Sequence, residues 1–99
     1  MTEPTSKQRA HLRSLAHSLK PVLQIGKEGV TPELVASVED AFRTRELLKV
    51  KVLEAAPLEA REAAGELARR IEGAYPVQVI GRTVVLYRRH PEKPEIALL

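Results

Sequence analysis

Residues 22–53 read VLQIGKEGVTPELVASVEDAFRTRELLKVKVL, and the pattern of this stretch predicts the architecture of the whole chain. A short apolar strand over 22–25 runs into a glycine-rich turn. Thr31 then has the side chain of a helix N-cap, and Pro32 suits the first helical position. Apolar residues recur at helical spacing from 34 to 42. The stretch therefore predicts a strand, a tight loop and an amphipathic helix.

A second strand is predicted over 47–53, where the side chains alternate in character. Leu48, Val50 and Val52 point one way, whereas Lys49 and Lys51 point the other way. This alternation is typical of a sheet that has one face exposed to water near this strand.

The remaining segments extend the same alternation of helix and strand. Apolar residues 12, 15, 16 and 19 predict the buried stripe of a helix over 6–18, which ends before Pro21. A third helix is predicted from about 58 to 72. Two strands, 75–80 and 83–88, are separated by Gly81 and Arg82, which suit a two-residue hairpin turn.

The order α-β-α-β-α-β-β predicts a single α/β domain with three helices and a four-stranded mixed sheet. Three parallel strands joined by right-handed crossovers would place the second and third helices on one face if both crossovers run in the same direction along the sheet. The opposite face would carry Lys49 and Lys51 unless the first helix covers it, and the sequence leaves that packing open. We expect the domain to span 5–89 and a loosely held tail to follow over 90–99.

Composition excludes several classes of function. The chain has 99 residues, which is enough for one domain, and no cysteine, so disulfide scaffolds, zinc fingers and thiol catalysis are excluded. No apolar run could span a bilayer and the N-terminus lacks a signal core, so we expect a cytoplasmic protein without a membrane partner. His11 and His17 lie about 120° apart on a helix and make a poor metal pair. We predict no active site, metal or cofactor.

The net charge is +3, and the excess of positive charge is uneven. Residues 1–27 contain five basic side chains and one acid, whereas residues 28–99 contain eleven basic and twelve acidic side chains. A local basic excess suggests a polyanionic partner, although ordinary solvated lysine and arginine would give the same pattern.

The loop formed by Gly26, Lys27, Glu28 and Gly29 is the strongest candidate site. Two glycines allow a ligand to approach the backbone closely, and the loop opens onto a helix N-terminus, where free N–H groups can receive a phosphate. Lys27 can add a charge-assisted contact. The alternative is an ordinary strand-to-helix turn that needs glycine for its dihedral angles.

Four segments in this order resemble the CRM domain (chloroplast RNA splicing and ribosome maturation). They are residues 6–21, the loop 26–31, the strand 46–52, and the closing hairpin at 77–82 with 86–88. The similarity covers roughly residues 5–89, and a single short domain is most similar to the bacterial stand-alone form, the YhbY type. It implies a fold akin to the C-terminal domain of translation initiation factor three.

The resemblance also implies RNA binding and association with precursors of the large ribosomal subunit. Its proposed RNA surface carries over to Gly26, Lys27 and Gly29, with Arg9, Arg13 and Lys20 beside them. Lys49 and Lys51 would extend this surface if their face of the sheet is open. Because the aromatic residues are few, we expect contacts to the RNA backbone and to RNA shape rather than to bases.

Two other functions stay open on the sequence, and we expect a monomer in each case. One is a protein-interaction adaptor whose basic face meets an acidic partner. The other is an enzyme that handles a phosphorylated small molecule at the glycine loop, although a base and a second phosphate ligand are missing. The residues by themselves do not distinguish RNA from DNA.

Overall fold

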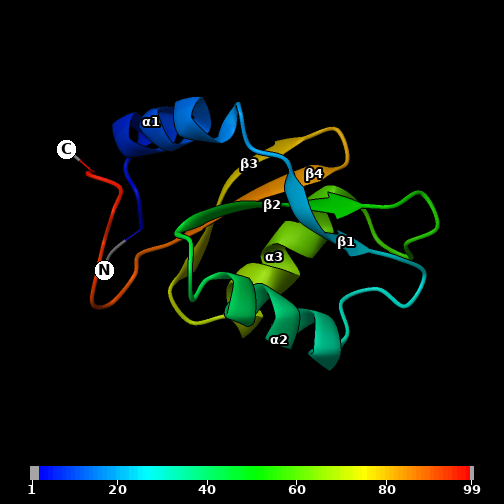
Figure 1. The fold of residues 1–99 in the computed structure, drawn as a ribbon. Helices are drawn as coiled ribbons and strands as arrows, with labels where there is room; N and C mark the ends of the chain where they lie inside the picture. The colour runs from blue at the N-terminus through cyan, green and yellow to red at the C-terminus, as the bar shows by residue number, and fades with distance from the viewer. Residues whose placement is uncertain (1–2, 99) are drawn as a thin grey trace.

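A four-stranded sheet with helices on both faces forms the protein, as Figure 1 shows for the computed structural model, which describes residues 3–98. The strands lie in the order β1-β2-β4-β3. The β1 and β2 strands are parallel, and β4 is antiparallel to both of its neighbours. The elements are α1 (Ser6–Ala16), β1 (Pro21–Ile25), α2 (Pro32–Ala41), β2 (Leu47–Val52), α3 (Ala60–Arg70), β3 (Ala74–Ile80) and β4 (Thr83–Arg88).

The predicted order of elements and the mixed sheet are confirmed. Strands β1, β2 and β3 run in the same direction, but β4 lies between β2 and β3. The reason is the burial of β4, whose four central residues, 84–87, are all buried. A strand that is apolar on both faces is most stable at the centre of a sheet, and the short turn at 81–82 pairs it with β3.

Helices α2 and α3 cover one face of the sheet (Figure 1) and bury the larger apolar cluster, which includes Phe42. The hydroxyl of Thr31 accepts a hydrogen bond from the N–H of Leu34 at 3.0 Å, as expected of an N-cap. Helix α3 begins at Ala60 rather than near Leu58. Its first turn is closed by the Glu62 carboxylate, which accepts the N–H of Glu59 at 3.2 Å.

Helix α1 packs on the opposite face (Figure 1), which answers the question that the sequence left open. Its buried contacts come from Leu12 and Ala16. The prediction that Leu15 and Leu19 are buried with them was wrong, because these side chains are 39% and 38% exposed. The helix ends at Ala16 and touches the sheet along a narrow stripe, so residues beside that stripe or beyond its end stay in water.

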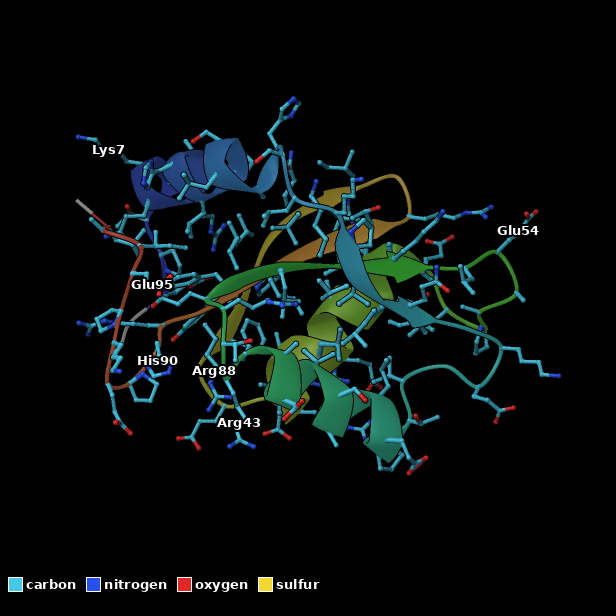
Figure 2. All side chains as sticks on the ribbon, viewed as in Figure 1. Lys7, Arg43, Glu54, Arg88, His90 and Glu95 are labelled. Carbon is cyan, nitrogen blue, oxygen red and sulfur yellow. The ribbon has the colours of Figure 1, made fainter. Side chains whose placement is uncertain are left out.

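Residues 90–98 of the tail are attached to the domain by hydrogen bonds and packing, whereas the sequence predicted a loosely held tail. The carboxylate of Glu46 is 5% exposed and accepts three backbone N–H groups of the tail, at 2.7–2.8 Å. The donors are the N–H groups of His90, Glu95 and Ile96. Ile96 also packs against the cluster under α1. Figure 2 shows His90 and Glu95 at one end of the sheet and Glu54 at the other.

Candidate nucleic-acid interface

The two sides of the sheet differ in charge because acidic residues are confined to particular segments. The segment 6–25, which contains α1 and β1, has no aspartate or glutamate, and neither do the other three strands. Acids lie instead in α2, in α3, in the connecting loops and in the segments before α1 and after β4. The face that α1 partly covers therefore carries cations that no carboxylate from these segments neutralises.

Within residues 3–98, some of the cations outside that face are paired with carboxylates, although others, such as Arg61, are not. Arg69 and Arg70 both reach Glu66 on α3, at 3.2 and 3.6 Å. At the ends of the sheet, Arg43 pairs with Asp40 and Arg82 pairs with Glu54, each at 3.6 Å. Exposed pairs of this kind add little stability, but they reduce the positive potential that a polyanion would meet.

Four of the predicted site residues lie on the α1 side of the sheet, and we call this set the basic face: Arg13, Lys20, Lys49 and Lys51. None of them forms an ion pair within the described part of the chain. Lys51 is exposed, and Lys20 is exposed between α1 and β1. Lys49 is half-buried, and its ammonium donates a hydrogen bond to the carbonyl of Leu19 at 2.9 Å. An ammonium has two further donors, so this contact orients Lys49 without saturating it.

Arg13 and Lys49 also line a depression where the end of α1 lies over the sheet. This depression, which we call the α1 hollow, has a volume of about 470 Å³. Its lining residues are Arg13, Ser14, Ala16, His17, Lys49, Gln78 and Ile80.

The glycine loop is a tight turn whose two glycines have different roles. The N–H of Gly29 donates to the carbonyl of Gly26 at 3.0 Å, which leaves Lys27 and Glu28 exposed at the tip. Gly29 has a φ of +74°, and an added Cβ would lie 3.2 Å from the side chain of Pro57. Gly26 has an ordinary φ and open space around its Cα. Only Gly29 is therefore required by the turn, whereas Gly26 leaves the backbone open to a ligand.

The start of α2 has fewer free N–H groups for a phosphate than the sequence suggested. Pro32 has no N–H, and the N–H of Leu34 already donates to Thr31. The Glu33 side chain adds a negative charge in the same turn. Phosphate contacts at this loop would therefore depend on Lys27 and on the backbone of the turn.

The structure does not bring all the predicted residues together. The register pairs Gln24 of β1 with Lys51 of β2, directly before Ile25, so Lys51 lies between the loop and the rest of the basic face. Arg9 lies one turn earlier on α1, where its guanidinium pairs with Glu3 and its Nε is buried without a partner. Figure 1 shows α1 and the loop after β1 at opposite ends of the molecule. Arg9 thus belongs to the packing of the N-terminal segment.

Two side chains of the hollow, Gln78 and Ile80, were not predicted as site residues. Simple alternation along β3 would place them on the face opposite Val77, which is buried under α1. The register of β3 against β4 shifts between Pro76 and Gln78. Because of this shift, Gln78 and Ile80 lie on the α1 side of the sheet, as Val77 does. Neither this shift nor the strand order that brings β3 beside α1 could be read from the sequence.

Residues 3–98 contain no cluster of three histidine or acidic side chains that could hold a metal ion. In the same part of the chain, no helix is long and apolar enough to cross a membrane.

A small α/β module with one basic, acid-free sheet face is the class that this geometry defines. Residues 5–88 match the CRS1 / YhbY (CRM) domain, and the chain therefore belongs to this family. Members of the family are non-enzymatic, and the chain is not an enzyme, as the sequence predicted.

Related proteins share nearly the whole chain. The Probable RNA-binding protein YqeI of Bacillus subtilis is 38% identical over 94 residues, which cover 95% of this chain and 97% of the relative. An RNA-binding protein of Haemophilus influenzae is 39% identical, with 93% and 92% covered. The solution structure of the hypothetical protein SAV1595 from Staphylococcus aureus superimposes with a TM-score of 0.82 at 39% identity, covering 98% of this chain and 100% of the other.

Proposed function

We propose that the chain is an RNA-binding protein whose basic face binds the sugar-phosphate backbone. The observation that supports this most strongly is that Arg13, Lys49 and Lys51 lie on one side of a sheet whose strands contain no acid. Two relatives of nearly equal length carry the name RNA-binding protein. RNA as the partner, rather than DNA, rests on these relatives and on the family.

The physical basis of this binding is the release of counterions. Each phosphate that a lysine or arginine neutralises releases condensed cations, so affinity falls steeply as salt rises, with a slope near −0.7 per phosphate on single strands. A cation that is already paired with a carboxylate contributes less to this effect. The unpaired state of the basic face therefore matters more than the small net charge of the whole chain.

The glycine loop would extend this surface at one end. Lys27 is exposed at its tip, and the open backbone at Gly26 lets a phosphate come close to the turn. Lys51, beside Gln24, lies between the loop and the hollow. We expect Arg9 to contribute little because Glu3 holds its guanidinium.

We further propose that the RNA is a precursor of the large ribosomal subunit and that the protein acts in its assembly in the cytoplasm. The resemblance of the ordered motifs to the stand-alone bacterial form supports this. The alternative is an adaptor that uses the same face to bind an acidic protein. Nuclease treatment of an affinity capture separates the two, since an RNA binder loses its partners and an adaptor keeps them.

A matched pair of charge reversals tests the proposal. Arg13→Glu with Lys51→Glu should weaken RNA binding by about tenfold for each cation that no longer meets a phosphate, and should lower the salt slope by about 1.4 on a single strand. Arg61→Glu with Arg69→Glu makes the same charge change on α3, where both side chains are exposed, and should alter affinity by less than about threefold.

Two readouts decide the outcome. Binding is measured by fluorescence anisotropy over a range of salt, with thermal melts to check folding. In cells, tagged wild type and the α3 variant should sediment with large-subunit particles, whereas the Arg13/Lys51 variant should not. Equal weakening of RNA binding in both variants would contradict a defined face, and migration of the wild type only as free protein would contradict the ribosomal role.

A further inference from the structure

We infer that the α1 hollow is a subsite for one unpaired nucleobase, so that the protein prefers RNA with a flipped-out nucleotide over a perfect duplex. This inference rests on the proposed RNA binding and adds a second kind of contact to it. The basic face alone would recognise phosphates, which every RNA presents equally.

The hollow exists because α1 stops before it crosses the sheet. Register places Lys49, Val85 and Gln78 in one row across β2, β4 and β3. Val85 is fully buried, whereas Lys49 and Gln78 are half-buried on either side of it. Two strand spacings, or about 10 Å, separate the backbones of Lys49 and Gln78. The hollow that both residues line has a volume of about 470 Å³, which lies within the range of small-molecule sites.

The lining has apolar surface that a phosphate cannot use. Ile80 is 53% exposed, more than any other large apolar side chain of the described residues, and the hollow lies between it and Ala16. Arg13 contributes a planar guanidinium, a group on which bases stack. The hollow therefore offers an aliphatic surface and a stacking plane, although the aromatic side chains usual for base stacking are absent from it.

Gln78 supplies the polar group that suits a base edge. Its side-chain amide forms no hydrogen bond within the described part of the chain. An amide presents a donor and an acceptor side by side, which matches the edges of bases, whereas a phosphate can use only the donor. Together with Ile80, it makes a base the better occupant of this hollow.

The neighbouring cations would hold the nucleotide's phosphates. Lys49 lies on one wall, oriented by its bond to Leu19, and Lys51 lies two residues further along β2 on the same face. A base that enters the hollow therefore has cations within reach of its own backbone. Bases inside a duplex are paired and stacked, so only an unpaired nucleotide could enter.

Two RNAs that differ by one nucleotide test the inference: a perfect hairpin duplex, and the same hairpin with one extra nucleotide bulged from the middle of its stem. Wild type should bind the bulged RNA about tenfold more tightly, the effect expected when one base is stacked. Gln78→Ala with Ile80→Ala should abolish that preference but leave the affinity for the duplex and its salt slope unchanged.

Val79→Ala is the matched control. Val79 lies between these two residues on β3 and is 37% exposed, but it lines a different depression on the α3 side of the sheet. This variant should keep the preference. Equal binding of both RNAs by the wild type, or a preference that survives in the Gln78/Ile80 variant, would overturn the inference.

The proposed function can fail separately. If the Arg13/Lys51 reversal leaves RNA binding unchanged, the basic face is not the RNA site and both proposals fall. If that reversal weakens binding but no bulge preference exists, only the base subsite falls. A nuclease-resistant protein partner that the Gln78/Ile80 variant fails to bind would assign the hollow to a protein and overturn the inference.

Discussion

The two sides of the sheet differ in how much apolar surface they bury and in how their surface cations are paired. On the α2 and α3 side, fifteen buried residues form one continuous apolar cluster, and exposed ion pairs hold several of the surface cations. Under α1, six of the described residues form the buried cluster, and no ion pair within residues 3–98 holds the cations of the basic face. A domain this small can leave part of one sheet face exposed to solvent only because the other face supplies most of the buried apolar surface.

Helix α1 buries little of its surface, since only Leu12 and Ala16 of this helix are buried. A helix that buried Leu15 and Leu19 would cover more of the sheet and close the hollow. The α1 side compensates in part through the tail, where Ile96 packs on the small cluster and the Glu46 carboxylate holds the backbone. The comparison therefore predicts that polar contacts contribute more to the free energy of unfolding on the α1 side of the sheet than on the α2 and α3 side.

Removal of the Glu46 carboxylate should have the largest effect on stability. Glu46→Ala leaves three tail N–H groups without their charged acceptor, and we expect a loss of about 2–3 kcal/mol in the free energy of unfolding. Urea denaturation measures it, with Glu92→Ala as a control at an exposed tail position. A loss below about 0.5 kcal/mol would show that the tail contributes nothing to the α1 side.

The two loop glycines should separate stability from binding. Gly29→Ala forces a side chain into a left-handed conformation against Pro57 and should cost about 1–2 kcal/mol. Gly26→Ala meets no neighbour, so its thermal melt should be unchanged or slightly raised. If RNA approaches the backbone at Gly26, this variant should nevertheless bind RNA more weakly in anisotropy. Equal melts for the two variants would contradict the distinction.

Alkaline pH should give the smallest effect, again on the α1 side. Burial raises the pKa of the Tyr87 phenol above its ordinary 10.0, and the charge of Glu46 raises it further, against a lowering by Arg89. The folded state therefore holds this proton more tightly than the unfolded state, so stability is full below about pH 10 and falls as pH rises through the folded pKa.

Tyr87→Phe removes this titration. The decline in unfolding free energy between about pH 9 and pH 11 should be smaller in Tyr87→Phe than in wild type. Urea denaturation at the two pH values measures the difference. Identical declines would show that the environment of Tyr87 does not distinguish the protonated phenol from the ionised one.

Local patterns were sufficient to predict the elements and the class of fold. The N-cap at Thr31, the alternation around Lys49 and Lys51, and the hairpin turn after Ile80 each depend on neighbours within a few residues, and each is found in the structure. The boundaries of α1 and α3 were less accurate, because helix ends depend on caps and on tertiary packing.

What the sequence by itself determined is the order of elements, the turn at the glycine loop and the scarcity of acids along 6–25 and in the strands, because these follow from local preference and composition. The tertiary structure alone decided that β4 lies beside β2, that α1 lies over the lysine face, and that Glu46 holds the tail. Those choices depend on which distant surfaces bury best against each other, and no local pattern contains that comparison.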